Sequence, residues 1–354
     1  MKLTLVDCAP PDQPGSMKEF GRMLEQALRT GGERGMAFER LPFYDPRPGL
    51  SMWQHHRWRM VKGTHILPAA NDGWLHLLDG SMGAFIPRRW WSRTLVTVHD
   101  VIPALIQRGD LPGASPSLPA RMLMRRSLAL LRACKAIHVD SGQTGRDVER
   151  LTGRKDFTVI PLAVRSFARQ RETIDLPARF MLHIGNNAAY KNRRGALEIF
   201  ARFQAMQDVH LIMAGPAPDD ELRRAAGNLS RVIFMNDVDD GTLATLYRKA
   251  SLLLFPSIYE GFGMPVLEAM AHGCPVVCSD AGSLPEVAGD AALMAAPGDI
   301  DTLARHGQAI LEDVTLRESL VARGKARAAT FSLSRMGNAF LDWYQRSTDN
   351  SPAA

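Results

Sequence analysis

The sequence has 354 residues, of which 45% are hydrophobic and 23% are charged, a balance typical of a soluble globular protein with about two domains. No apolar run approaches the roughly 18 residues of a membrane span, and the start, MKLTLVDCAP, lacks the long apolar segment of a signal peptide, so we expect a cytoplasmic protein. The net charge of +6 favours an anionic partner, such as a phosphorylated small molecule, nucleic acid or an anionic membrane surface.

Short apolar runs alternate with amphipathic helical patterns along most of the chain. The expected strands are 3–6, 94–100, 136–141, 157–162, 180–185, 209–215, 231–235, 251–257 and 275–280. The expected helices are 16–30, 144–152, 193–206, 241–249, 301–314 and 333–346. Repeated strand-then-helix units predict an α/β protein with parallel sheets and helices on both faces.

Two irregular stretches interrupt this pattern. The segment 106–120 is rich in Gly, Pro and Ser, and we expect a mobile loop there. The segment 165–179 is polar and lacks clear periodicity, so it is expected to link two α/β halves. Open sheets of this kind bind ligands at the carboxyl ends of their strands.

The stretch IYEGFGMPVLEAMAHGCPVV (258–277) places two glutamates around a glycine loop. After a buried strand, the loop leads into a short helix with Pro265 as its first residue, Glu268 in its first turn and Gly273 just past its end. Free N–H groups at the start of a helix favour phosphate, and carboxylates accept hydrogen bonds from hydroxyls. Glu260 and Glu268 therefore suit the two polyol ends of a nucleotide sugar. For an isolated pair, local capping and complementation of the helix dipole would explain both glutamates.

Together with SLPEVAGDAAL (283–293), this stretch resembles the signature of glycosyltransferase family 4, which comprises retaining enzymes of the GT-B fold. The resemblance is dense from residue 183 to about residue 297 and continues more weakly at 96–103 and 140–148. It implies a GT-B fold, in which two Rossmann-like domains face each other across a cleft.

The resemblance also implies domain limits. The acceptor-binding domain is expected over residues 1–165, and a C-terminal helix at about 335–350 can pack back on it. The domain that binds the nucleotide sugar is expected over residues 166–334.

The resemblance implies roles for individual residues. Glu260 would contact hydroxyls of the donor sugar, and Glu268 would hold the ribose. Lys191 would contact the diphosphate beside a helix that Asn192 caps. The expected catalytic residues are His99, Glu260 and Lys191. The expected donor-binding residues are Gly15, Gly185, Asn186, Lys191, Val238, Glu260, Gly261, Phe262, Gly263, Met264 and Glu268.

Some of these assignments depart from the family pattern or rest on weaker signals. Asn186 stands where members of the family often have an arginine, and Arg193 or Arg194 can supply the missing phosphate contact. His99 ends a strand, where the resemblance implies a position near the donor sugar, although a lone histidine is usually only packed. Gly15 would let the backbone approach the diphosphate.

The acidic run DVDD (237–240) matches an Asp-x-Asp metal pattern, but it directly precedes a helical segment. Acidic residues stabilise helix starts, so we interpret this run as the start of a helix. Neither a metal nor a cofactor is expected, because the resemblance implies that cations and helix N-termini neutralise the leaving diphosphate.

The resemblance implies retaining transfer of a sugar to an acceptor hydroxyl in bacterial polysaccharide or glycolipid assembly. By analogy, mannose from GDP-mannose is the expected donor sugar. Two alternative functions keep the same fold: a glycosyltransferase that uses a soluble acceptor, and a nucleotide-sugar epimerase. A catalytically degenerate protein that binds nucleotide sugars is the non-enzymatic alternative. No nucleic-acid motif is present, so nucleic acid is not an expected partner.

The basic segment 121–135 and the run PRRWWSR (87–93) suit an anionic lipid interface. They predict a lipid-linked saccharide acceptor and peripheral contact with the inner face of the cell membrane. A solvated basic face over an ordinary packed helix explains the same residues equally well.

Overall fold

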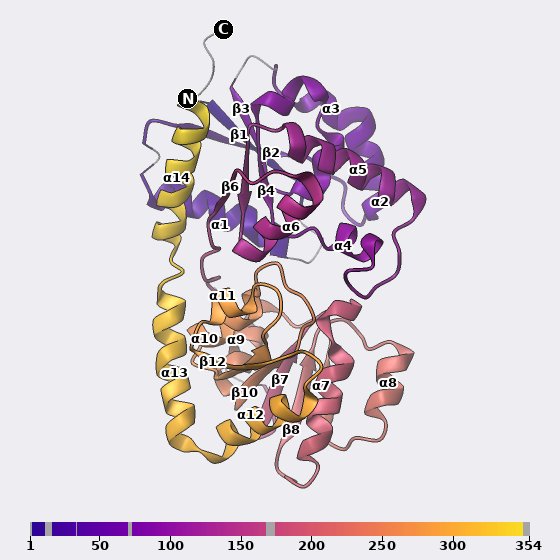
Figure 1. Ribbon diagram of the computed structural model, residues 1–354, viewed down its shortest axis with the longest axis vertical. Coiled ribbons are helices and arrows are strands. Elements are labelled where there is room, and N and C mark those ends of the chain that lie inside the picture. Colours follow the sequence, from indigo (N-terminus) through magenta and orange to yellow (C-terminus); the bar gives the residue numbers. More distant parts are fainter. Residues whose placement is uncertain (1, 11–15, 33, 70–72, 168–173, 350–354) are drawn as a thin grey trace. The chain divides into compact units, whose positions relative to one another are not determined.

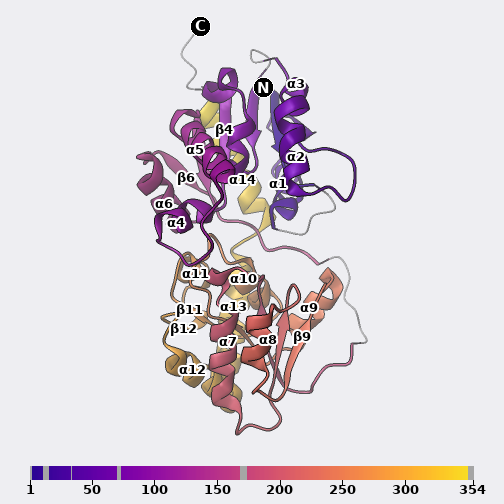
Figure 2. The ribbon, with the colours of Figure 1, turned by 90° about the vertical axis from the view of Figure 1, so that its right-hand side faces the viewer.

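The computed structural model describes residues 2–10, 16–32, 34–69, 73–167 and 174–349 (Figure 1). By its internal contacts the chain divides into two compact units. Unit 1 contains Met1–Asp110, Ala114–Ala163 and Ser332–Ala354, and unit 2 contains Leu111–Gly113 and Val164–Phe331. Each unit has a six-stranded parallel sheet with helices on both faces (Figures 1 and 2).

The sheet of unit 1 has the strand order β2-β1-β3-β4-β5-β6. Its strands are β1 (Lys2–Asp7), β2 (Ala37–Pro42), β3 (Trp74–Leu77), β4 (Thr94–Val98), β5 (Ala136–Val139) and β6 (Phe157–Val159). Its α-helices are α1 (Ser16–Thr30), α2 (Met52–Trp58), α3 (Thr64–Ile66), α4 (Ile102–Arg108), α5 (Leu118–Ala133), α6 (Gly142–Thr152) and α14 (Leu333–Asp349). A π-helical turn, η1 (Arg59–Gly63), joins α2 to α3, and two 3-10 segments, η2 (Gly80–Phe85) and η3 (Arg88–Arg93), precede β4.

The sheet of unit 2 has the strand order β12-β11-β10-β7-β8-β9. Its strands are β7 (Phe180–Ile184), β8 (His210–Ala214), β9 (Val232–Met235), β10 (Leu252–Phe255), β11 (Val276–Ser279) and β12 (Ala292–Ala295). Its α-helices are α7 (Arg193–Phe200), α8 (Asp220–Ala226), α9 (Asp240–Lys249), α10 (Met264–Ala271), α11 (Leu284–Ala288), α12 (Ile300–Glu312) and α13 (Val314–Ala329). Two 3-10 turns, η4 (Ala189–Lys191) and η5 (Ala201–Phe203), flank α7.

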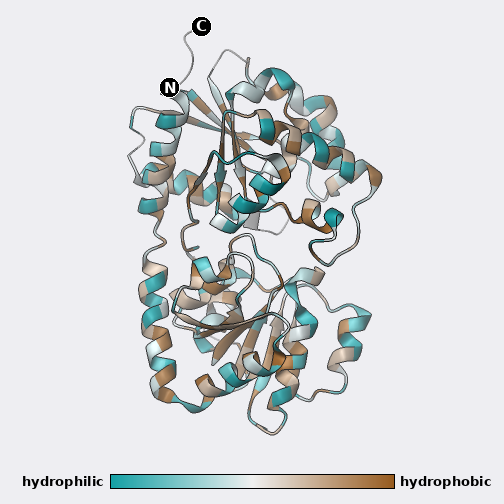
Figure 3. Ribbon diagram, in the orientation of Figure 1, coloured by the Kyte–Doolittle hydropathy of each residue, from teal (hydrophilic) through white to brown (hydrophobic). Residues whose placement is uncertain are grey.

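Burial on both faces explains why the central strands are continuously apolar. All four residues of β10, LLLF, are fully buried between the helical layers. Leu252 and Leu254 share a core with apolar side chains of α7, α12 and α13, including Phe200, Leu303 and Leu320. Figure 3 shows the strands of both sheets as hydrophobic and the helices as mixed.

Most of the predicted elements are confirmed, with different limits. All nine expected strands form, but β2, β3 and β12 were not predicted. The helix expected at 193–206 ends at Phe200 and continues as a 3-10 turn. The loop expected at 106–120 is shorter, because α4 extends to Arg108 and α5 begins at Leu118. Residues 168–173 of the expected linker lie outside the described residues.

Helix α14 packs against α1 within unit 1, and their backbones approach closely at one point. A Cβ atom at Gly337 would lie 2.0 Å from the Ala27 carbonyl oxygen, so only glycine fits there. Gly31, directly after α1, faces the same contact, and a Cβ there would lie 2.7 Å from the Leu341 side chain. This close packing positions the aromatic side chains of α14 over the sheet of unit 1.

A buried chain of hydrogen bonds joins α14 to three adjacent strands. The Tyr344 hydroxyl lies 2.8 Å from Nδ1 of His76, whose Nε2 lies 2.8 Å from the Thr97 hydroxyl. That hydroxyl lies 3.0 Å from Nδ1 of His138, whose Nε2 lies 2.9 Å from the Ile160 carbonyl oxygen. A carbonyl only accepts, so His138 donates to Ile160 and each group along the chain donates to the next. This order requires both imidazoles to be neutral, and burial lowers the pKa of His138 to about 4 and that of His76 well below its usual value.

The predicted aromatic membrane surface at PRRWWSR is wrong in part. Trp90 is fully buried in the core of unit 1, and Trp91 is half-buried, with its Nε1 donating to the Ile86 carbonyl at 3.0 Å. Within the described part of the chain, no helix is long and apolar enough to cross a membrane.

Candidate functional site

Lys191 is placed by a tight loop at the carboxyl end of β7. The loop closes with the 3-10 turn η4, and Asn192 then takes a left-handed conformation (φ 53°) and caps α7 by accepting from the Gly195 amide at 3.1 Å. The other end of the same amide, Nδ2, donates to the Pro256 carbonyl at 2.9 Å. The expected cap at Asn192 is therefore confirmed, and it also ties the start of α7 to the segment that follows β10.

Glu260 follows β10 in a loop that is pinned by the segment before α11. The Ser283 amide donates to the Glu260 carbonyl at 3.1 Å, and the Ser283 hydroxyl lies 2.7 Å from the Phe262 carbonyl. Gly282 passes directly over Glu260, where a Cβ atom would lie 2.6 Å from its carbonyl oxygen, and its φ is +60°. A glycine is required for this approach, because any other residue would displace the glutamate backbone.

The two loops bring Lys191 and Glu260 together as an ion pair. The Lys191 Nζ lies 2.8 Å from each carboxylate oxygen of Glu260. The side chains are 17% and 8% exposed, so the pair is largely removed from water. A backbone hydrogen bond of 2.7 Å from the Ile258 amide to the Tyr190 carbonyl supports this pairing from behind.

Helix α10 begins beside this pair. Gly263 lies at its N-terminus with φ +100°, and within the described part of the chain no side chain caps it. The helix starts at Met264, one residue earlier than predicted, so Pro265 is its second residue. The placement of Glu268 in the first turn is wrong: it is the fifth residue of α10, so its carboxylate does not complement the helix start.

Glu268 instead points into the unit, where it is 5% exposed. Its Oε2 accepts a hydrogen bond of 2.7 Å from the fully buried Tyr247 hydroxyl, and its Oε1 lies 2.9 Å from Nε of Arg165. Burial raises the pKa of Glu268, whereas Arg165 and Tyr247 act to lower it. This geometry excludes the dipole explanation and leaves a buried carboxylate with two polar partners.

The other expected donor-binding residues of unit 2 lie around the same strand ends. Gly185 follows β7 and packs against Gly215, where a Cβ would meet the Gly185 carbonyl oxygen at 2.2 Å. Asn186 accepts from the Ala188 amide at 3.0 Å, and Val238 is half-buried between β9 and α9. Gly261, Phe262, Gly263 and Met264 form the loop between Glu260 and α10.

The two arginines considered as substitutes for a missing phosphate contact have other partners. Arg193 is buried and donates to the Asn187 side chain and, at 3.1 Å, to the Pro216 carbonyl. Arg194 is exposed and pairs with Glu198 and Glu221. Arg193 therefore holds two loops together, and neither arginine is aimed at the Lys191–Glu260 pair.

The acidic run before α9 is confirmed as a helix start. Asp239 caps the helix by accepting from the Thr242 amide at 2.7 Å, and Asp240 is its first residue. Among the described residues, no group of three or more His, Cys, Asp or Glu side chains is placed to hold a metal ion.

His99 lies in unit 1, and both of its ring nitrogens face acceptors. Nδ1 lies 2.5 Å from the Asp140 carboxylate, and Nε2 lies 3.0 Å from the Leu78 carbonyl oxygen. Burial lowers the pKa of His99, but the charge and hydrogen bond of Asp140 outweigh it and raise this pKa to about 9. His99 is therefore an imidazolium near neutral pH and cannot act as a general base. Gly15, the other residue expected from this half, lies outside the described residues.

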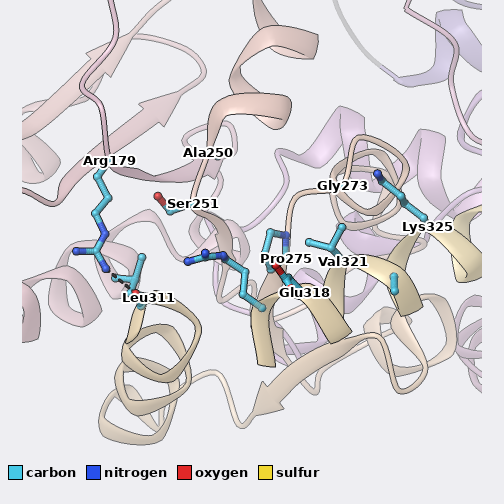
Figure 4. A pocket seen from close by; sticks show the side chains of 11 residues that line it. Arg179, Ala250, Ser251, Gly273, Pro275, Leu311, Glu318, Val321 and Lys325 are labelled. Carbon is cyan, nitrogen blue, oxygen red and sulfur yellow. Dashed lines mark hydrogen bonds between the residues drawn. The ribbon is translucent and has the colours of Figure 1, made fainter. Parts of the chain in front are cut away.

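A cavity of about 550 Å³ lies at the opposite edge of the sheet of unit 2, by the amino ends of β7, β10 and β11. Figure 4 shows Arg179 turned toward Leu311 at one end of it and Lys325 at the other. Arg179 donates to the Leu311 carbonyl at 2.6 Å and pairs with Asp208 at 2.9 Å. The cavity is thus separate from Glu260 and Glu268, which follow the carboxyl end of β10.

Sequence analysis missed Tyr247 and Arg165. Tyr247 lies in the predicted helix 241–249, where a tyrosine on the apolar face indicates packing and nothing more. Arg165 opens the polar segment that was expected to be a linker, and no spacing relates it to Glu268. Only the tertiary structure brings these residues to the second glutamate.

Comparisons with known proteins identify a family for most of unit 2. Residues 164–327 match the family described as "Glycosyl transferases group 1". The chain is 40% identical over 160 residues to the O-antigen chain mannosyltransferase B of Escherichia coli, covering 43% of this chain and 42% of that protein. It spans less than half the length of the curated relatives it matches.

Two solved structures share the fold. Sucrose-phosphate synthase from Thermosynechococcus elongatus superposes with a TM-score of 0.78 at 20% identity, covering 99% of this chain and 100% of that one. Anabaena Alr3699/HepE, in complex with UDP and glucose, superposes with a TM-score of 0.71 at 18% identity, covering 98% and 100%. These likenesses and the two parallel sheets confirm the predicted GT-B fold class.

The matched segment contains Lys191, Glu260 and Glu268, the residues on which the predicted resemblance rests. The segment 164–327, which makes up most of unit 2, therefore belongs to the group 1 glycosyl transferases, glycosyltransferase family 4.

Proposed function

We propose that this chain transfers a sugar from a nucleoside diphosphate to an acceptor hydroxyl with retention of the anomeric configuration. The observation that carries the proposal is the buried Lys191–Glu260 pair beside the uncapped start of α10, with 2.8 Å between Nζ and each carboxylate oxygen. This places an acceptor for sugar hydroxyls next to a cation and a helix N-terminus, both of which suit a diphosphate.

The pair also indicates how these side chains act during transfer. When a donor enters, sugar hydroxyls hydrogen-bond to Glu260, while Lys191 turns to the phosphate oxygens. As the glycosidic bond breaks, negative charge grows on the leaving diphosphate, which Lys191 and the amides at the start of α10 stabilise. The leaving phosphate then assists removal of the acceptor proton, so no protein nucleophile is required.

Mannose is the proposed sugar, and GDP-mannose the proposed donor. The support is the similarity to an O-antigen chain mannosyltransferase. Thermal stabilisation by GDP, UDP, ADP and their sugars tests this, with wild type and Glu268→Ala compared. We expect the largest shift with GDP and its loss in the variant. No shift with any nucleotide would contradict the proposal.

A lipid-linked saccharide is the proposed acceptor, at an anionic membrane surface. Large apolar side chains are exposed on the segment α2–η1–α3, among them Trp53, Met60 and Val61, beside exposed Arg57 and Lys62. Apolar and basic side chains on one segment suit an anionic lipid interface.

Sedimentation with phosphatidylglycerol vesicles at low salt tests the membrane proposal. We expect the wild type to sediment and Trp53→Ala to sediment less. Met122→Ser is the matched variant on α5, the basic segment expected from the sequence, where Met122 is also exposed. Failure of the wild type to sediment would contradict membrane contact.

A further inference from the structure

The carboxylate of Glu268 is held from two sides by residues of two other segments. The Tyr247 hydroxyl, from α9, donates to Oε2 at 2.7 Å, and Nε of Arg165 lies 2.9 Å from Oε1. Among the described residues, Tyr247 and Arg165 thus supply one side-chain partner to each carboxylate oxygen. Because a carboxylate oxygen can accept more than one hydrogen bond, both oxygens keep the capacity to accept a ligand hydroxyl.

Arg165 is itself fixed by further contacts. Its Nη1 lies 3.1 Å from Oδ1 of Asp240, the first residue of α9, and its guanidinium carbon lies 4.3 Å from the centre of the Phe167 ring. Its side chain is 18% exposed, so it stands between the buried carboxylate and solvent. A guanidinium held by three groups is a fixed partner for Glu268.

Tyr247 is equally constrained. It is fully buried, and its ring stacks on His272 with centroids 5.6 Å apart. His272, the C-cap residue of α10, has its Nδ1 2.8 Å from the Glu268 carbonyl oxygen. The hydroxyl is thus fixed relative to the helix that carries the glutamate.

We propose that Tyr247 and Arg165 are positioning residues, which keep Glu268 ionised and oriented to accept hydrogen bonds from the ribose hydroxyls of the donor. This inference rests on the proposed function. A buried carboxyl without them would favour its neutral form, which is a poorer acceptor for two adjacent hydroxyls.

The charged and titratable groups around Glu268 determine how the pH dependence changes. Burial raises the pKa of Glu268, Arg165 and the Tyr247 hydrogen bond lower it, and Asp240 raises it. His272 packs against Tyr247 from the end of α10. Removing the Arg165 charge leaves burial and Asp240 to act together, so the carboxyl takes up its proton at a higher pH.

The test is the dissociation constant of GDP, with UDP in parallel, at pH 6 and pH 8 by calorimetry. For Arg165→Gln we expect binding about tenfold weaker than wild type at pH 6, because the Glu268 carboxyl without the Arg165 charge is then protonated. Binding should be near wild type at pH 8, where the carboxyl is ionised. Tyr247→Phe should weaken binding at both pH values, since it removes the hydrogen bond that orients the Glu268 carboxylate. Arg165→Lys, which keeps the charge, should restore binding at pH 6.

Two controls separate this inference from the proposed function. Glu268→Gln cannot titrate, so the ratio of its GDP dissociation constant to that of the wild type gives the baseline at each pH. Arg194→Gln is the second control, because it removes an exposed arginine of the same unit. If Glu268→Gln weakens binding but Arg165→Gln binds as well as wild type or better at pH 6, the inference is overturned and the proposed function stands. If Glu268→Gln binds like wild type, both are overturned.

Discussion

The ammonium group of Lys191 lies 2.8 Å from both carboxylate oxygens of Glu260, and both side chains are largely buried. Removing one partner of a buried pair leaves the other charge uncompensated. We predict that Lys191→Met lowers the free energy of unfolding by about 1–3 kcal/mol and abolishes sugar transfer. Urea denaturation followed by circular dichroism, beside an assay of released diphosphate, measures both effects.

The double variant Lys191→Met/Glu260→Gln separates stability from function. Without the buried charge at residue 260, most of the lost stability should return, while transfer stays absent. A double variant that is no more stable than Lys191→Met would show that the cost does not come from the unpaired carboxylate.

Gly282 offers a test of the loop that places Glu260. A Cβ there would lie 2.6 Å from the Glu260 carbonyl oxygen and 2.7 Å from its amide nitrogen. Gly282→Ala should therefore displace the Glu260 backbone, reduce transfer at least tenfold and destabilise the fold by about 1–3 kcal/mol. Gly298→Ala is the matched control, because a Cβ at Gly298 meets no atom of the described residues within 4 Å. Equal losses in both variants would contradict the steric argument.

The Asp140–His99 contact predicts a stability change at alkaline pH. Burial alone would lower the pKa of His99, and Asp140 raises it to about 9, above the value of about 6.5 in an unfolded chain. The contribution to stability is full below pH 6.5 and is lost as the pH rises through about 9. In Asp140→Asn, the pKa of His99 should fall below 6.5 and this alkaline loss should disappear. NMR titration of the His99 ring checks this, and a variant that still titrates near pH 9 would contradict it.

The sequence allowed prediction of most of the fold because the buried parallel strands are mostly apolar. Strands such as LLLF at 252–255 stand out as apolar runs, whereas β2, AFERLP, is an edge strand with no fully buried residue. The central strand β3, WLHL, was also missed, although β5, AIHV, has the same length and also contains a buried histidine. Strand length and polar content therefore do not separate β3 from the strands that were found.

The site was predictable where the chemistry is local in sequence. Glu260, the glycine loop and the start of α10 lie within a few residues of each other, so their spacing identified them. The partners of Glu268 are separated from it by 21 residues at Tyr247 and by many more at Arg165, and no periodicity connects them. The position of Glu268 in α10 was wrong because the helix starts at Met264, one residue earlier than Pro265 suggested.

The hydrogen-bond chain from Tyr344 to Ile160 gives two further predictions. Tyr344→Phe leaves Nδ1 of the fully buried His76 without its donor, so the free energy of unfolding should fall by about 1–3 kcal/mol. Thr97→Val interrupts the chain at its centre, and the two changes should be less than additive, since each removes a bond of one connected network. Denaturation of wild type, both single variants and the double variant gives this coupling.

Acid should weaken the same chain, because its order requires neutral imidazoles. Burial holds the pKa of His138 at about 4, below the value of about 6.5 expected in the unfolded chain. The stability that His138 contributes is therefore present above pH 6.5 and is lost as the pH falls toward 4. Hydrogen exchange of α14 amides at pH 7 and pH 5 follows the loss. The quantity to compare is the protection factor, which is the exchange rate of each amide relative to an unfolded chain at the same pH. If the α14 protection factors of Tyr344→Phe at pH 7 are as low as those of the wild type at pH 5, the hydrogen-bond chain is what holds α14 to the sheet. If the variant and the wild type have equal protection factors at pH 7, that role belongs instead to the apolar packing around Gly337.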